Sequence, residues 1–222
     1  MNNTCRRCKI IAMMQKGPMS PAPHTETMDP RARRTRQLLQ DALEKLLAEK
    51  DFEKISVQDV AETATLNRAT FYDHYTDKFG LLECLVATRF CQLLEERNIR
   101  FDGCEGAIRK MAIGVCSYLA EMPRAKLASQ PNSGQHLETA IVAVLRGMIL
   151  EGINSHQGRQ RISPELLAST VAWAIFGAAK EWLRTPNRVS VDRIATTIEA
   201  MVTPIFSAGQ NPAVSSKVRR NT

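Results

Sequence analysis

The sequence has no apolar run that approaches the roughly 20 residues needed to cross a membrane. Its hydrophobic fraction of 44% is that of an ordinary globular protein. The apolar block from Ile10 to Met14 is too short for the core of a secretory signal. Six cysteines are few for 222 residues, and four of them lie inside apolar helical patterns. We therefore expect a soluble protein of the reducing cytoplasm that needs no disulfide scaffold.

Motifs for catalysis and for metal binding are also missing. Cys5 and Cys8 have the spacing of zinc ligands, but no second pair follows, so we expect no metal site and no cofactor. The four histidines are scattered, and the sequence holds no Ser/His/Asp order and no glycine-rich phosphate loop, which argues against an enzyme. Cys84, Cys91 and Cys116 fall at core positions, whereas a redox sensor needs an exposed, activated thiol.

The part of the chain that carries the candidate DNA-binding helices has no excess of positive charge. The net charge is +7, but residues 29–78 carry 9 basic and 10 acidic side chains. The excess lies mainly in residues 1–28, with 4 basic and 1 acidic side chains, and in residues 211–222, with 3 basic and none acidic. Net charge is therefore poor evidence for DNA binding, and local placement must decide.

The two ends show no periodicity, and we expect disorder over residues 1–29 and 209–222. Several methionines precede the first regular element, which raises the hypothesis of a translation start downstream of Met1. Between the ends, helical periodicity is present throughout and no strand-like alternation is sustained, so the fold class is predicted to be all-α.

Four helices are predicted in the first part of the chain. The first begins at Arg31 and carries leucines on one face. Ser56 opens a capping box with Asp59 for a second helix that runs to about Thr63. After the turn Ala64-Thr65-Leu66, Asn67 caps a third helix that reaches Tyr75, and Asp77 caps a long fourth one.

Further helices are predicted at about 103–121, 123–129, 133–154, 163–184 and 190–207. Ser163 followed by Pro164 is a strong start signal, and Thr185-Pro186-Asn187 is an equally clear stop. The expected organisation is a helix-turn-helix domain over residues 30–76, joined by a long helix to a helical-bundle domain over residues 77–208 for ligand binding and dimerisation.

Two short helices joined by a tight turn can present the second helix to the major groove of DNA. Core positions would pack the three helices together and leave polar side chains of the third helix outside. Arg68 could bind guanine, Thr70 a base or a phosphate, and Ala69 a thymine methyl group. Tyr72, His74 and Lys78 would hold phosphates and fix register. Four arginines, among them Arg33 and Arg34, crowd the start of the first helix and supply local positive charge.

The stretch from Arg33 to about Leu85 resembles the DNA-binding domain of the TetR/AcrR family of repressors. The residues that carry the resemblance are Arg36, Leu39, Ala42, Phe52, Ile55, Val57-Gln58-Asp59-Val60-Ala61, Asn67-Arg68-Ala69-Thr70-Phe71-Tyr72-Asp73-His74-Tyr75, Asp77-Lys78 and Leu81-Leu82. The resemblance implies a homodimeric repressor of an inverted-repeat operator that a small ligand releases. It places Arg68, Ala69 and Thr70 at bases and Tyr72, His74 and Lys78 at the backbone. The DNA-binding set is completed by Arg33, Arg34, Ser56 and Val57.

One departure from the family pattern lies in the turn, where many members have glycine and this chain has Thr65. A residue with a Cβ must then adopt a left-handed conformation at higher cost.

The last two long helices, about 163–184 and 190–207, match by position the helices that build the dimer interface in related regulators. Apolar side chains could line a ligand cavity between helices, although the same pattern is also that of plain core. The candidates are Met111, Val115, Tyr118, Trp173 and Phe176. Few charged residues fall among these apolar positions, so an apolar or aromatic effector is favoured. The expected partners are double-stranded DNA, a second copy of the chain and a small effector, with no membrane; a helical adaptor that does not bind DNA is the alternative.

Overall fold

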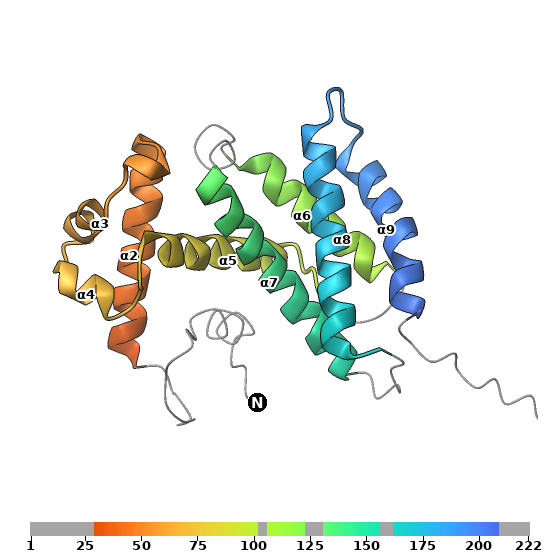
Figure 1. Ribbon diagram of the computed structural model, residues 1–222, viewed down its shortest axis with the longest axis horizontal. Helices are drawn as coiled ribbons and strands as arrows, with labels where there is room; N and C mark the ends of the chain where they lie inside the picture. Colours follow the sequence, from red (N-terminus) through yellow and green to blue (C-terminus); the bar gives the residue numbers. More distant parts are fainter. Residues whose placement is uncertain (1–28, 102–105, 123–130, 156–161, 209–222) are drawn as a thin grey trace, which may run out of the picture.

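The computed structural model describes residues 29–101, 106–122, 131–155 and 162–208, and all its regular elements there are helices, with no strand. Three helices form a unit at one end of the molecule (Figure 1): α2 (Pro30–Glu49), α3 (Val57–Thr63) and α4 (Arg68–Tyr72). The long α5 (Lys78–Glu96) leads from this unit to a bundle of α6 (Ala107–Glu121), α7 (Pro131–Ser155), α8 (Pro164–Arg184) and α9 (Val191–Ala208). The predicted all-α architecture is confirmed.

The start signals in the sequence act as predicted. The Ser163 side chain accepts a hydrogen bond from the Leu166 amide at 3.2 Å, and Pro164 occupies the first position of α8. Helix α2 begins one residue before the predicted Arg31, because Asp29 caps it and Pro30 takes its first position. The Asp29 carboxylate accepts a hydrogen bond from the Arg31 amide at 3.0 Å.

Three predicted boundaries differ from the structure. Helix α6 begins at Ala107 rather than at about residue 103, after Gly106 with a φ of 82°. Helix α4 ends at Tyr72 rather than Tyr75, because the His74 amide bonds back three residues to the Phe71 carbonyl and tightens the chain into a turn. Helix α7 begins at Pro131, two residues before the predicted start. The predicted helix at 123–129, the expected disorder at both ends and the Cys5–Cys8 pair lie outside the described residues.

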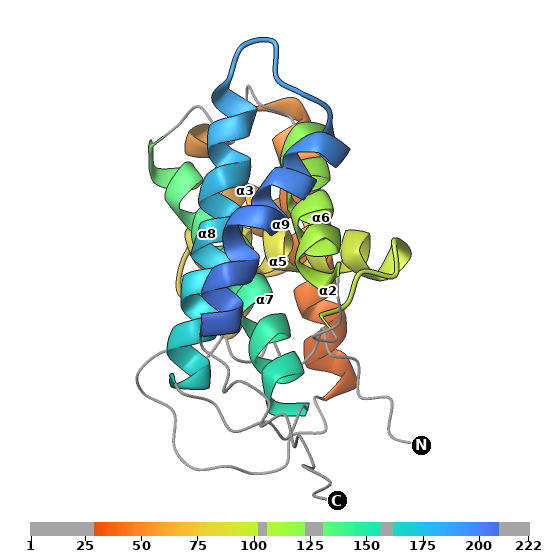
Figure 2. The same cartoon turned by 90° about the vertical axis from the view of Figure 1, so that its right-hand side faces the viewer.

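A single hydrophobic core runs through both parts of the molecule, with α5 as its shared wall. Helix α5 packs against α2 on one side and against α7 on the other, and α7 packs in turn against α8. In Figure 2, α8 and α9 lie side by side on the face turned to the viewer. None of the described helices is both long enough and apolar enough to cross a membrane.

Candidate nucleic-acid interface

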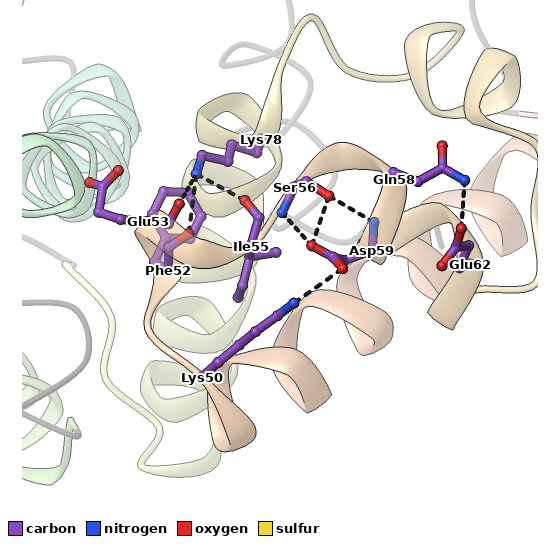
Figure 3. A network of polar contacts seen from close by, with 9 residues as sticks. All are labelled: Lys50, Phe52, Glu53, Ile55, Ser56, Gln58, Asp59, Glu62 and Lys78. Carbon is purple, nitrogen blue, oxygen red and sulfur yellow. Dashed lines mark hydrogen bonds and ion pairs between the residues drawn. The ribbon is translucent and has the colours of Figure 1, made fainter.

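The start of α3 is held by a network of polar contacts around Asp59 (Figure 3). The Ser56 amide donates to the Asp59 carboxylate at 2.7 Å, and the Asp59 amide donates to the Ser56 hydroxyl at 3.1 Å, which completes the predicted capping box. Lys50, at the end of α2, forms an ion pair with the same carboxylate at 3.1 Å. The hydrogen bonds from Ser56, and then the contact with Lys50, lower the pKa of Asp59 to about 2. The ionised carboxylate thus joins α2 to α3.

The turn between α3 and α4 contains the left-handed residue that the sequence predicts. Thr65 has a φ of 57°. Its amide donates to the Glu62 carbonyl at 3.0 Å, and the Leu66 amide donates to the Ala61 carbonyl at 2.9 Å. These two hydrogen bonds close the end of a helix when the first residue after the C-cap is left-handed, as Thr65 is here. Thr65 therefore supplies the conformation at which glycine would carry less strain.

Helix α4 presents the predicted polar face to solvent. Asn67 caps it by accepting a hydrogen bond from the Ala69 amide at 2.9 Å, and Phe71 is fully buried beneath it. Arg68 and Ala69 are exposed, Thr70 is half-buried, and Tyr72 is 47% exposed. The Arg68 guanidinium donates to the Tyr72 hydroxyl at 3.1 Å, so these two side chains form one surface. That hydroxyl still has its own proton to donate to a partner.

Lys78 has a different environment from the one that the sequence suggests. Instead of projecting from the start of α5, its ammonium donates to the carbonyls of Phe52 at 3.2 Å, Glu53 at 3.1 Å and Ile55 at 2.9 Å (Figure 3). An ammonium has three N–H donors, so this set engages all of them. Lys78 thereby joins α5 to the short 3-10 turn Phe52–Lys54 that precedes α3, and the phosphate contact expected of it stays a prediction.

The other predicted DNA-binding residues lie around this unit. Arg33 and Arg34 are exposed in the first turns of α2, Ser56 is exposed, and Val57 is half-buried at the start of α3. His74 is half-buried in the turn after α4. Burial lowers the pKa of His74, the positive charge of Arg36 lowers it further, and Asp73 partly opposes both.

The predicted ligand-cavity residues have different environments. A pocket of about 370 Å³ lies between α2, α5 and the end of α6, and of the five candidates Tyr118 lines it. Met111, Val115 and Phe176 are buried in the core, and their contact with a ligand stays a prediction. Trp173 is 52% exposed on α8.

The buried cysteines support the prediction against a redox sensor. Cys84, Cys91 and Cys116 are buried and form no disulfide. Burial raises the pKa of Cys116 to about 12, which keeps its thiol protonated and unreactive at neutral pH. Cys104 lies outside the part of the chain that the structure describes.

Several contacts in this region are not predicted by the sequence. The acceptors of Lys78 are backbone carbonyls, and no side-chain pattern marks them. The His136 ring of α7 stacks on Phe79 with centroids 4.7 Å apart, and its Nδ1 lies 2.5 Å from a carboxylate oxygen of Glu83. These contacts join residues more than 50 positions apart, which only the packing of α5 against α7 brings together.

Comparison with known proteins places this unit in a family. Residues 39–85 match the family model described as bacterial regulatory proteins, tetR family. A stretch of 101 residues is 34% identical to the uncharacterized HTH-type transcriptional regulator YxbF of Bacillus subtilis (strain 168). That stretch covers 43% of this chain and 26% of the length of the relative.

Solved structures share the fold over most of this chain. The TetR family repressor AlkX from Dietzia sp. strain DQ12-45-1b, implicated in biodegradation of n-alkanes, aligns with a TM-score of 0.54 at 19% identity, over 78% of this chain and 98% of that one. RolR, in complex with the ligand resorcinol, aligns with a TM-score of 0.50 at 14% identity, over 82% and 96% of the two chains. A match to regulatory proteins agrees with the prediction that the chain is not an enzyme. Residues 39–85 are thus similar to the DNA-binding region of the tetR family, and the described helices share the fold of AlkX.

Proposed function

We propose that the chain is a ligand-responsive transcriptional regulator that binds double-stranded DNA as a homodimer and represses transcription from an inverted-repeat operator. The observation that carries the proposal is the exposed pair of Arg68 and Tyr72 on α4, in a unit held by Asp59 and Lys78. Rigid support matters because specific base contacts need side chains in fixed register on the duplex.

The side chains of this unit divide into two roles. Arg68, Ala69 and Thr70 face the bases: an Arg can donate to O6 and N7 of guanine, and a methyl group can contact thymine. Tyr72, His74, Ser56, Arg33 and Arg34 face the phosphate backbone, where they fix position without reading sequence. Val57 supports the start of α3 from its half-buried position. Lys78 acts through the Phe52–Ile55 segment rather than on DNA.

The face for dimerisation is formed by α8 and α9. Four large apolar side chains are exposed there: Leu166, Trp173, Met201 and Ile205, at 60%, 52%, 52% and 39%. The two helices are held together at their junction, where Trp182 Nε1 donates to the Val189 carbonyl at 2.8 Å. An apolar face of this kind on a fixed pair of helices suits packing against a second copy. A dimer is also needed to hold two reading helices about 34 Å apart, one turn of DNA.

The ligand-responsive and repressor parts of the proposal draw on proteins that share the fold. AlkX is named as a repressor, and RolR was solved with resorcinol, a small aromatic molecule. We therefore infer a small apolar or aromatic effector for this chain.

Selection of binding sites from random duplex DNA tests the proposal directly. We expect enrichment of an inverted repeat whose half-sites lie about one helical turn apart, with affinity that falls steeply as salt rises. Failure to enrich any inverted repeat would reject the function. The helical-adaptor alternative predicts no enrichment at all.

Two substitutions separate the roles of neighbouring residues on α4. Arg68→Ala should cost about 1–3 kcal/mol at one base position and relax the preference there. Tyr72→Phe keeps the ring and removes the hydroxyl, so it should weaken binding to all duplexes by a similar factor. The opposite pattern would reverse the assignment of these two residues.

A further inference from the structure

Gln58 occupies the second position of α3, and its side chain is exposed. Its amide donates a hydrogen bond to the Glu62 carboxylate at 2.7 Å, one helical turn further along α3 (Figure 3). We propose that Gln58 reads an adenine in the major groove, in addition to the bases read from α4, and that Glu62 orients it. This inference rests on the proposed function and adds a specificity-determining residue to it.

The contact with Glu62 fixes which end of the Gln58 amide is engaged. An ionised carboxylate can only accept hydrogen bonds, so the bond comes from an N–H of the amide and not from its oxygen. Residues four positions apart on a helix are neighbours on its surface, and a charged acceptor strengthens the bond between them. The carboxylate therefore favours one orientation of the amide before DNA is bound.

The groups of Gln58 that Glu62 leaves unused match the major-groove edge of adenine. A glutamine amide has two N–H donors and one acceptor oxygen, and Glu62 takes one of the donors. Adenine presents an acceptor at N7 and a donor at its N6 amino group, and glutamine pairs with both at once. A phosphate has no donor, so it would leave the amide oxygen without a partner. The remaining N–H and oxygen thus suit an adenine better than the DNA backbone.

The start of α3 has a suitable position in the helix-turn-helix unit. When the second helix of such a unit enters the major groove, the first helix crosses the DNA backbone beside that groove. Helices α3 and α4 pack against each other across the turn at Thr65. Gln58 follows two residues after Ser56, the exposed N-cap of α3. A long side chain at this position extends past the backbone toward the base edges.

The charge of α3 argues against phosphate binding as the role of Gln58. The helix from Val57 to Thr63 contains no lysine or arginine. Lys50, which reaches α3 from α2, forms an ion pair with Asp59. Glu62 adds an exposed negative charge. Because phosphate binding depends on cationic side chains, α3 gains little from it, and its exposed amide is better suited to reading a base.

Selection of binding sites with wild type and two variants of the full chain tests the inference. Wild type should enrich an adenine in each half-site, at a position other than the one that Arg68→Ala relaxes. Gln58→Met keeps the length of the side chain and removes its hydrogen-bonding groups, so the discrimination against other bases at that adenine should fall by about fivefold or more. Gln37→Met is the matched control, because the Gln37 amide donates to Asp41 at 2.8 Å in the same arrangement on α2. It should leave every base preference unchanged.

A duplex with 7-deazaadenine at that position tests the contact at the level of one atom. This base still pairs with thymine but carries a C–H group in place of N7, so it cannot accept the N–H of Gln58. Wild type and Gln37→Met should bind it about threefold or more weakly than the natural duplex. Gln58→Met should bind the two duplexes equally. Equal losses in wild type and Gln58→Met, or no loss in wild type, would overturn the contact.

The orienting role of Glu62 is tested by a rescue. Glu62→Ala removes the acceptor, so the preference for adenine should fall by about twofold or more. Glu62→Gln removes the same charge but keeps a side-chain oxygen that accepts a hydrogen bond, so it should retain most of the preference. Both variants lose a negative charge near the phosphates and should bind all duplexes more tightly to a similar degree. Equal adenine preference in Glu62→Ala and wild type would overturn the orienting role.

The selection separates failure of this inference from failure of the proposed function. If wild type enriches no duplex, the proposed function fails and the role of Gln58 fails with it. If wild type enriches an inverted repeat and folded Gln58→Met keeps the same preference at every position, the proposed function stands and the role of Gln58 alone is rejected. Far-UV circular dichroism checks the fold of each variant, and the comparison of natural and 7-deazaadenine duplexes with wild type needs no variant.

Discussion

The Lys78 ammonium lies over the ring of Phe52, with Nζ 4.7 Å from the ring centroid, and donates to the carbonyl of the same residue at 3.2 Å. Lys78 opens α5, and Phe52 opens the 3-10 turn that leads into α3. The contact thus joins the start of the long helix to the segment from which the reading unit is built. Loss of this contact should lower the free energy of unfolding and weaken DNA binding.

Replacement of Lys78 by Met tests this role. Hydrogen bonds to a charged donor are worth about 1.5–3 kcal/mol, so we expect the free energy of unfolding to fall by about that amount in urea titrations. Lys54→Met is the control, since Lys54 is 73% exposed in a surface pair with Asp51, and such pairs contribute about 0–1 kcal/mol.

The same variant distinguishes positioning from phosphate binding. Removal of a lysine that binds a phosphate reduces the slope of log affinity against log salt concentration by about one. Lys78→Met should weaken DNA binding and leave the slope unchanged, whereas Arg34→Ala should reduce it. A reduced slope in Lys78→Met would show instead that Lys78 contacts a phosphate directly.

Thr65→Gly should stabilise the protein. A left-handed conformation costs a residue with a Cβ about 1–2 kcal/mol, and part of this gain is offset by the greater freedom of glycine in the unfolded chain. We expect an increase of about 1 kcal/mol in the free energy of unfolding. Thr65→Ala keeps the Cβ and should give no such gain. Comparable stabilisation by both substitutions would show that the left-handed strain is not its source.

The Asp59 carboxylate should make stability depend on pH. Its native pKa of about 2 is below the ordinary value of 3.8, so the native state favours the ionised form. The contribution is present above about pH 4 and is lost as the pH falls toward 2. Asp59→Asn should therefore unfold at lower urea than wild type at pH 7, with a smaller difference at pH 3. Glu62→Gln, on the exposed side of the same helix, is the control and should show no such convergence.

The sequence predicts the capped starts of α3, α4, α5 and α8 and the left-handed Thr65 because these depend on neighbours within a few residues. The resemblance also places Arg68 and Tyr72 on one exposed face. The role of Lys78 was not predictable, because its partners are backbone carbonyls more than 20 positions away. The ligand cavity stays a prediction for a similar reason: helical spacing marks Met111 and Phe176 as inward-facing but does not say whether a neighbouring helix fills the space.

His74 should make DNA binding depend on pH. Burial and the charge of Arg36 lower its pKa in the free protein, so the imidazole is neutral at pH 7. Phosphates beside it would favour the protonated form and raise its pKa in the complex, so protons are taken up on binding. Affinity should then rise as the pH falls from about 7.5 to about 6. His74→Gln, which cannot titrate, should lose that part of the rise, and an unchanged pH profile would place His74 away from the phosphates.

The apolar face of α8 and α9 should determine the oligomeric state. Trp173 is 52% exposed in the single chain and contacts Phe176 edge-on with ring centroids 6.3 Å apart, so Trp173→Lys removes little of the core. On a dimer interface the same change buries a charge without a partner, which costs several kcal/mol and should shift the protein to monomer in sedimentation equilibrium. Leu38→Lys is the matched control, since Leu38 is 39% exposed on α2 at the other end of the molecule. The Leu38→Lys variant should remain dimeric. If Trp173→Lys dimerises with wild-type affinity, the dimer interface lies elsewhere on the molecule.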